Sequence, residues 1–254
     1  MTWLRLAMLH LRALRGRLLV LLAFSAVFLA AAGTARLVGA GAEGHVEIDR
    51  IFEIGGAPLA SALLLIGWAI GRFPMIAVLV LTAGLISHDR ATGQARLYLA
   101  RPTSPVGLYA VRFLVLTLIA FVSSAVLVPA FDVIMLGRWA GPNTLLLIAA
   151  YVVTYGSITA LLSAWTRGDA WIALLLGILA IVWHSLRVGG VLENTPPGVR
   201  EVVSLILPPH GALFAIESAF AQLGALPLDA FLYILIYGAV LLLLAGISIA
   251  QREV

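Results

Sequence analysis

The side chains that could carry out acid–base, nucleophilic or metal chemistry are few in this chain. Its five histidines lack the spacing of metal ligands, and no H-E-x-x-H segment is present. The absence of cysteine excludes disulfides, thiolate metal sites and cysteine nucleophiles. There is also no Gly-x-Ser-x-Gly segment and no pair of carboxylates within an apolar run. The sequence therefore predicts a protein that is not an enzyme and holds no metal ion.

All sixteen basic residues are arginine, which bears directly on nucleotide binding. A P-loop places a lysine on the phosphates of ATP, so this chain cannot bind ATP in that way. Schiff-base chemistry is excluded for the same reason. We therefore expect no cofactor in this chain, and any ATP and magnesium must lie on a separate subunit.

The composition predicts one all-α integral membrane domain over residues 1–254. Hydrophobic residues make up 62% of the chain and charged residues only 11%, and the mean hydropathy is +1.08. A soluble domain of this length needs more charge to cover its surface. Six apolar runs lie near the ~20 residues that cross a bilayer as a helix. These predicted spans are 18–38, 58–87, 113–136, 145–165, 170–188 and 230–250.

The second apolar run, 58–87, is too long for one straight crossing. Pro74 interrupts helical hydrogen bonding and Arg72 is unfavourable in hydrocarbon, so we expect a kink here, near the outer surface. Two short spans over 58–71 and 75–87 are the alternative, but that arrangement removes the charge asymmetry described next.

The arginines are distributed asymmetrically between the predicted loops. With both termini inside, the inner segments contain ten arginines and three acidic residues, whereas the outer segments contain six arginines and nine acidic residues. The positive-inside rule therefore predicts six spans with cytoplasmic termini. The Arg-, Ala-, Leu- and Gly-rich composition is typical of a GC-rich bacterial genome, so the expected location is the bacterial plasma (inner) membrane.

The segment "WLRLAMLHLRALRGR" predicts an interfacial elbow helix within residues 1–17. Arg5, Arg12 and Arg15 share one helical face, suited to anionic headgroups, and Trp3 lies with apolar side chains opposite. The alternative is the basic start of a signal peptide with a cleavage site at "LAAAG", but the following apolar run is longer than usual for one.

The longest predicted outer segment is 189–229. Its two proline pairs, at 196–197 and 208–209, divide it into two short helices rather than one span. Apolar stretches of 10–14 residues suit re-entrant or interfacial helices. We therefore expect an outer re-entrant helical hairpin before the last span.

The segment "HDRATGQARLYLAR", 88–101, places charged residues between two apolar runs. As a helix it puts Arg90, Gln94 and Arg101 on one face and apolar residues on another, and Pro102 ends it. It is either an amphipathic helix that offers an arginine face to a partner or an ordinary positive-inside loop. The residues alone leave both interpretations open.

The run 85–114 resembles the signature of type-2 ATP-binding-cassette (ABC) exporter permeases. In that family the second span ends in an acidic–Arg pair, which is followed by a Gly, a Leu-rich turn and a Pro-containing stop. A Gly–Lys pair typically begins the next span. The matching residues here are Asp89 with Arg90, Gly93, Leu97 to Leu99, and Arg101 with Pro102. The departures are Asp89 for the usual Glu, Pro105 for a common basic residue, and Arg112 for the usual Lys. The basic chain end "AQREV" and the predicted topology are also similar to the family.

The resemblance implies that residues 88–105 form a cytoplasmic coupling helix that docks onto an ATPase subunit. The implied contacts are Asp89, Arg90, Gly93, Gln94, Arg96, Tyr98, Arg101 and Pro102. It also implies two permease subunits, identical or paralogous, bound to two P-loop ATPase subunits and moving a hydrophobic or amphiphilic substrate such as a lipid, drug or peptide. The alternative is a secondary transporter or channel without an ATPase, which normally has intramembrane charges or matched broken helices.

Polar residues within the spans are candidates for a transport pathway. Ser123, Thr154 and Tyr155 could line a cavity, although hydrogen bonds between packed helices are an equal explanation. Asp132 and His184 lie near the outer ends of spans three and five, where a substrate or proton role competes with solvation at the interface. Their position near span ends favours the interface.

Overall fold

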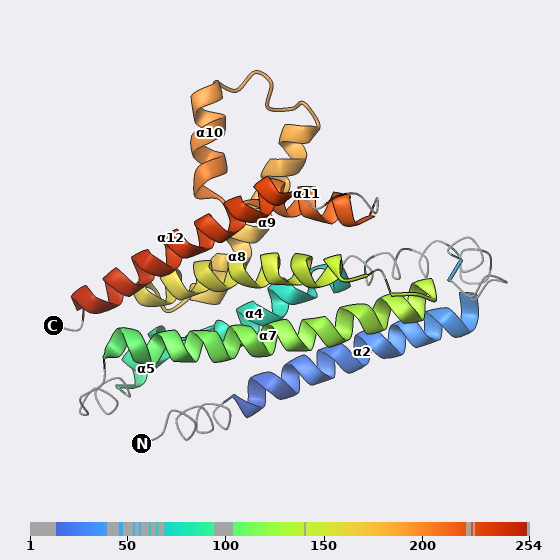
Figure 1. The fold of residues 1–254 in the computed structure, drawn as a ribbon, viewed down its shortest axis with the longest axis horizontal. Coiled ribbons are helices and arrows are strands. Elements are labelled where there is room, and N and C mark those ends of the chain that lie inside the picture. Colours follow the sequence, from blue (N-terminus) through green and yellow to red (C-terminus); the bar gives the residue numbers. More distant parts are fainter. Residues whose placement is uncertain are drawn as a thin grey trace. The chain divides into compact units, whose positions relative to one another are not determined.

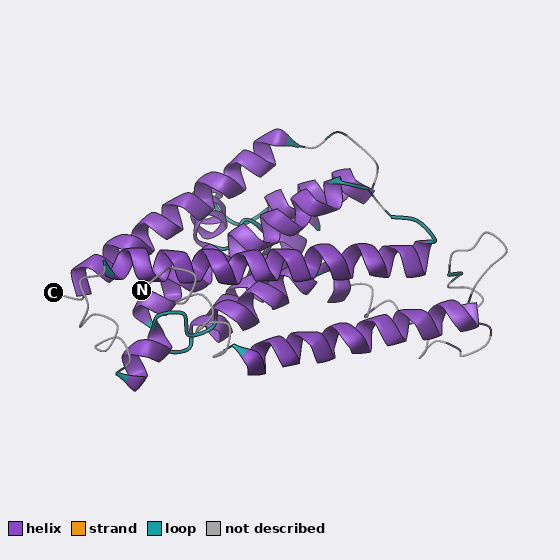
Figure 2. Cartoon of the chain, turned by 60° about the horizontal axis from the view of Figure 1, so that its bottom comes forward, coloured by secondary structure: helices purple, strands orange, loops and turns teal. Residues whose placement is uncertain are grey.

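The computed structural model describes residues 14–39, 46–47, 53, 56, 61, 65, 69–93, 104–139, 141–221, 225 and 227–252. Of these residues 84% are helical, and none of them lies in a β-strand (Figures 1 and 2). The predicted all-α class is therefore confirmed for the part of the chain that is described. The helices are α2 (Arg15–Gly39), α4 (Phe73–Thr82), α5 (Ser87–Thr92), α7 (Pro105–Leu136), α8 (Asn143–Trp165), α9 (Asp169–Val188), α10 (Pro197–Ile206), α11 (His210–Ala221) and α12 (Leu228–Arg252).

Six helical segments of the described residues are long and apolar enough to cross a membrane. They are Arg15–Gly39, Phe73–Thr92, Pro105–Met135, Asn143–Trp165, Asp169–Val188 and Leu228–Gln251. Each overlaps one of the six predicted spans. Backbone polar groups in lipid must be paired within the chain, and a helix achieves this along its whole length. The chain is thus a multi-pass helical membrane protein.

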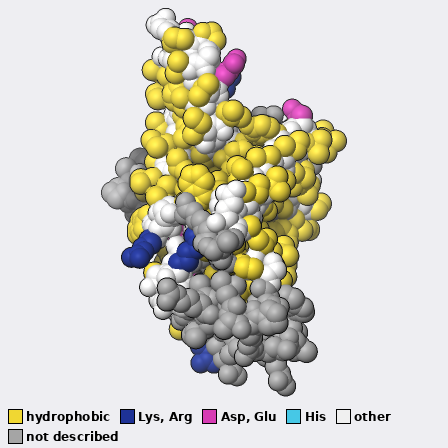
Figure 3. All heavy atoms as spheres, turned by 90° about the vertical axis from the view of Figure 1, so that its left-hand side faces the viewer, with side chains coloured by type: hydrophobic (Ala, Val, Ile, Leu, Met, Phe, Trp, Pro, Cys, Tyr) yellow, Lys and Arg dark blue, Asp and Glu magenta, His cyan; other side chains and the backbone are white. Residues whose placement is uncertain are grey.

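The exposed surface also fits a lipid environment. Large apolar side chains stay exposed along α2, α7, α9 and α12, and hydrophobic atoms dominate the described surface in Figure 3. In water such surface would drive aggregation, whereas lipid tails solvate it. By contrast, 67% of the residues in the most apolar 18-residue stretch of Phe73–Thr92 and 61% of those in the corresponding stretch of α8 are buried, so these two segments are the most enclosed by protein.

The second span, predicted over 58–87 with a kink beside Pro74, has an additional break that the sequence did not predict. A turn at Arg72 separates helical residues 69–71 from α4, which agrees with the kink expected beside Pro74. The helix α4 then ends at Thr82, and Gly84 has a left-handed φ of 67°. Glycine lacks the Cβ that disfavours this conformation, so Gly84 permits a sharp turn before α5.

The prediction of one continuous helix over 88–101 is wrong, because the helix ends within this segment. The helix α5 ends at Thr92, because Gly93 adopts a left-handed φ of 73° as its C-terminal cap. The helix α7 begins at Pro105, before the predicted start of the third span at 113. Proline is favoured at a first helical position, where its missing N–H has no helical partner to lose.

Contacts between Cα atoms divide the chain into two compact units, which we describe separately. The first comprises Met1–Ala77 and Ile119–Ile148. In it, the Arg36 guanidinium at the end of α2 donates to the carbonyl oxygen of Ile134 at 2.7 Å. The last carbonyls of a helix lack partners within it, so Arg36 caps the C-terminal end of α7.

The second unit comprises Val78–Leu118 and Ala149–Val254, and close approach at two glycines shapes its core. A Cβ on Gly177 of α9 would lie 2.9 Å from Tyr155 of α8, and one on Gly238 of α12 would lie 2.6 Å from Val153. Small residues let membrane helices approach closely and gain dispersion contacts. These two glycines therefore set how α9 and α12 pack on α8.

The helices α10 and α11 confirm that the proline-rich segment forms two short helices (Figure 1). They meet at an angle of 79°. Pro197 begins α10, and the buried Pro208 and Pro209 lie in the link before α11. The helix α11 packs on α9 and α12, whereas α10 has no buried residue.

Candidate functional site

The short helix α5 has one buried side and one exposed side. Ser87 and Asp89 are buried, together with Ile86 in the preceding turn. His88 and Thr92 are exposed. A helix of this length has too few internal hydrogen bonds to be stable by itself, so its conformation depends on contacts with other elements.

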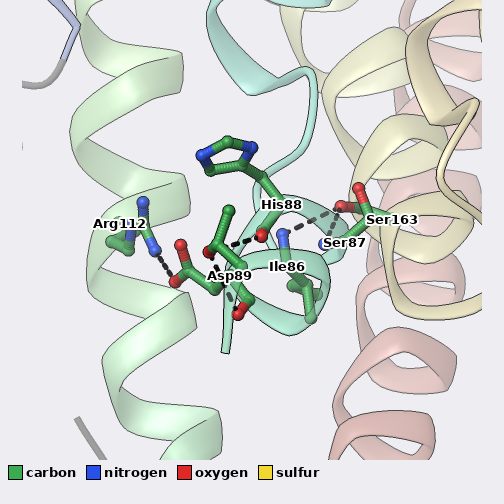
Figure 4. A network of polar contacts seen from close by, with 7 residues as sticks. Ile86, Ser87, His88, Asp89, Arg112 and Ser163 are labelled. Atoms are coloured by element: carbon green, nitrogen blue, oxygen red, sulfur yellow. Dashed lines mark hydrogen bonds and ion pairs between the residues drawn. The ribbon is translucent and has the colours of Figure 1, made fainter. Parts of the chain in front are cut away.

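The first of these contacts is an ion pair between α5 and α7. The Arg112 guanidinium donates to Oδ2 of Asp89, whose side chain is 1% exposed, and Figure 4 shows the two side chains meeting between the helices. The other carboxylate oxygen, Oδ1, has no partner among the described residues. Removing either member would leave a charge largely out of water, which is strongly unfavourable.

The second contact joins the start of α5 to the end of α8. Ser163 accepts hydrogen bonds at Oγ from the backbone N–H of Ile86 at 2.9 Å and of Ser87 at 3.2 Å (Figure 4). The first N–H groups of a helix have no partner within it. Ser163, although distant in sequence, satisfies two backbone donors that would otherwise be buried and unpaired.

A carboxylate at the start of α9 holds the same turn. Oδ2 of Asp169 accepts from the backbone N–H of Gly84 at 2.8 Å and from the Ser87 hydroxyl at 3.4 Å. Asp169 is 3% exposed. Hydrogen bonds to a charged acceptor are stronger than neutral ones, so this buried carboxylate is a firm attachment for the α4–α5 turn.

Arg90 adds a further attachment to the same region. Its guanidinium donates to the carbonyl oxygen of Ala164 at 2.7 Å, near the C-terminal end of α8. A cation is favoured at this end of a helix by the unpaired carbonyls and the helix dipole. Together, Asp89, Arg90, Ser163 and Asp169 fasten α5 to α7, α8 and α9. We call these four residues and Arg112 the α5 anchor.

The predicted ATPase-binding residues fall into three groups: two that contact this chain itself, one that is exposed, and five that lie outside the described residues. Asp89 and Arg90 contact this chain itself, and Gly93 is exposed at the end of α5. The others, Gln94, Arg96, Tyr98, Arg101 and Pro102, lie outside the described residues. The exposed residues His88 and Thr92 were not singled out from the sequence, because no pattern in the sequence distinguished the exposed from the buried side of so short a helix.

Most of the predicted interfacial helix also lies outside the described residues, including Trp3, Arg5 and Arg12. Arg15 is exposed and is the first residue of α2, so the first long helix begins before the predicted boundary at residue 18. No proline separates Arg15 from the apolar run, and the helix continues through both.

The predicted pathway residues occupy ordinary helix-packing positions or a separate pocket. The Ser123 hydroxyl donates to the carbonyl of Ala120 in its own helix. Thr154 and Tyr155 are fully buried, and the Tyr155 ring stacks on Tyr151 with 6.2 Å between centroids. His184 lines a pocket that is described below. A role in transport remains a prediction for these residues.

Comparison with protein families, curated proteins and solved structures does not identify a family for this chain. No protein-family model matches the sequence, and neither the curated proteins nor the solved structures give a significant match. What is established is therefore the helical, multi-pass membrane architecture and the geometry of the α5 anchor.

Proposed function

We propose that this chain is the membrane-spanning subunit of an ATP-driven exporter of the type-2 ABC class. A separate P-loop ATPase supplies the energy, since a chain without lysine has no P-loop of its own. Two permease subunits and two ATPase subunits form the complex, which moves a hydrophobic or amphiphilic substrate. In this proposal α5 is the element that the ATPase contacts.

The attachment of α5 is the observation that carries the proposal. Transmitting movement requires an element that is exposed on one side and rigidly attached on the other. The exposed His88 and Thr92 satisfy the first condition, and the α5 anchor satisfies the second. Each hydrogen bond to a charged group contributes about 1.5–3 kcal/mol, so several of them resist local unfolding of α5.

The anchor also suggests where an applied movement would travel. A push on α5 is passed to the first turns of α7 through Asp89 and Arg112, and to the α8–α9 link through Ser163 and Asp169. Packed helices move as rigid bodies rather than deforming continuously. Closure of the two ATPase subunits on binding ATP would then shift these helices together and open a path between the two permease subunits.

Site-specific photo-crosslinking tests the proposal. A photoreactive amino acid at the exposed Thr92 should crosslink a polypeptide that contains a P-loop and hydrolyses ATP when the complex is purified from native membranes. The same group at the exposed Glu193, in the α9–α10 link, is the matched control and should give no such product. Equal crosslinking of the ATPase at both positions, or none at Thr92, would contradict docking at α5.

A further inference from the structure

A pocket of about 430 Å³ lies in the second unit, where α9, α12 and the α10–α11 pair meet. It is formed by the last turns of α9, the first turns of α12 and α11, Ser204 of α10 and the link between α10 and α11. Its volume is within the range of roughly 300–1,000 Å³ typical of small-molecule sites. The pocket is separate from the α5 anchor, with which it shares no residue.

Two helices each supply one charge and one aromatic ring to this pocket. Trp183 and Arg187 lie four residues apart on α9, and Asp229 and Tyr233 lie four residues apart on α12. Residues at this spacing share a helical face. The pocket therefore has a cation with an aromatic ring on one wall and an anion with an aromatic ring on another.

The two charges do not neutralise each other. Within the described part of the chain, Arg187 and Asp229 form no ion pair with each other or with any other residue. The Arg187 guanidinium donates to the Ser204 hydroxyl at the long distance of 3.5 Å. Nε2 of His184, also in the lining, has no partner among the described residues. The pocket thus offers donors and an acceptor that a ligand can satisfy.

The depth of the pocket in the membrane indicates the source of the ligand. Arg187 lies next to the last residue of one candidate span, and Asp229 lies next to the first residue of another. Span ends are level with the lipid headgroups, and Trp and Tyr are enriched at this level. A ligand at this depth is therefore expected to be a lipid whose headgroup contacts these residues and whose acyl chains extend into the bilayer.

We propose that this pocket binds the headgroup of a zwitterionic phospholipid. The Arg187 guanidinium binds the phosphate, because this planar group can donate two parallel hydrogen bonds to phosphate oxygens. The ammonium group is held by the Asp229 carboxylate and by the face of Tyr233 or Trp183. An anionic lipid without an ammonium group satisfies only half of the site, so the pocket discriminates in favour of the zwitterion. This inference does not depend on an ATPase partner.

Binding of short-chain lipids to the purified, delipidated chain tests the inference. Native mass spectrometry compares dihexanoyl phosphatidylethanolamine, dihexanoyl phosphatidylglycerol and free O-phosphoethanolamine. We expect the zwitterionic lipid to bind about tenfold more tightly than the anionic lipid, the difference of one charge-assisted contact. Free O-phosphoethanolamine, which lacks acyl chains, should bind more weakly than either lipid.

Substitutions separate the two halves of the pocket. Arg187→Gln should weaken the binding of both lipids about tenfold, whereas Asp229→Asn should weaken the binding of the zwitterionic lipid only. The matched controls, Arg200→Gln and Glu201→Gln on α10, lie outside the lining and should leave affinity unchanged. Both Arg187 and Asp229 are exposed, so thermal unfolding should be unaffected. Equal affinity of the wild type for both lipids, unchanged binding in Arg187→Gln, or equal binding of free O-phosphoethanolamine and the lipid would overturn the assignment.

Discussion

Asp89 on α5 and Arg112 on α7 form an ion pair in which the aspartate is almost completely buried. The pair joins the short helix at the end of the second candidate span to the beginning of the third. An exposed pair of this kind contributes little to stability, but a buried one is strongly unfavourable to break. Asp89 therefore stabilises the position of α5, and this role does not require a bound partner.

We predict that Asp89→Ala lowers the free energy of unfolding by about 3–5 kcal/mol, because it leaves the Arg112 charge without its partner. Thermal unfolding of the protein in detergent measures the change. In the double variant Asp89→Ala/Arg112→Ala, part of the lost stability should return. Arg138→Ala, at an exposed position in the α7–α8 link, is the control and should change stability by less than about 0.5 kcal/mol. Additive effects of the two single substitutions would show that the pair is not coupled.

Ser163→Ala should release the start of α5 without unfolding the protein. The substitution leaves the backbone N–H groups of Ile86 and Ser87 unpaired, at a local cost of about 1–3 kcal/mol. Hydrogen exchange of these two amides should then be faster, while exchange in the middle of α8 stays unchanged. Ser218→Ala is the control, because that hydroxyl bonds only within its own helix. Unchanged exchange at Ile86 and Ser87 would show that Ser163 is not their essential acceptor.

Gly93→Ala isolates the backbone requirement at the end of α5. A Cβ there meets no atom within 4 Å, so the substitution changes only the strain of the left-handed φ of 73°. We expect a loss of about 1–2 kcal/mol in stability. Gly16→Ala in α2 also adds a Cβ in open space but in a normal helical conformation, and should be neutral or slightly stabilising. Equal effects of both substitutions on the melting temperature would contradict this account.

The close contact between α12 and α8 predicts a steric effect at Gly238. A Cβ added to Gly238 would lie 2.6 Å from Cγ1 of Val153, so Gly238→Ala should destabilise the protein by about 1–3 kcal/mol. Val153→Ala in the same chain should restore much of the loss, because it removes the clashing methyl group. Gly33→Ala, which meets no atom within 4 Å, is the control. Failure of Val153→Ala to restore the melting temperature would place the strain elsewhere.

If α5 is the docking element, substitutions on its two sides should have different effects. Thr92→Trp, on the exposed side, should reduce stimulation of the partner ATPase while leaving the melting temperature unchanged. Arg90→Glu should lower both the stimulation of the ATPase and the melting temperature, because it removes the hydrogen bond to Ala164 and places an anion at the C-terminal end of α8. Parallel measurement of ATPase rate and melting temperature separates the two effects. Full stimulation in Thr92→Trp would contradict docking through this side.

The amino-acid sequence by itself determined the features that depend on local patterns. Apolar runs of membrane length predict the six spans because a helix is the conformation that pairs its own backbone groups in lipid. The proline pairs at 196–197 and 208–209 predict two short helices for a similarly local reason, and both helices are present. The breaks at Gly84 and Gly93 were missed because glycine is common within membrane helices and does not by itself mark a turn.

Only the tertiary structure decided what the polar residues do. Asp89 and Arg90 have the appearance of exposed charges in the sequence, yet their partners, Arg112 and Ala164, come from other helices. The same holds for Ser163, which bonds to Ile86 although 77 residues separate them. The placement of Arg187 and Asp229 in the lining of one pocket is likewise a result of helix packing. Such contacts depend on which helices pack together and in what rotation, and the periodicity of a single helix carries no information about either.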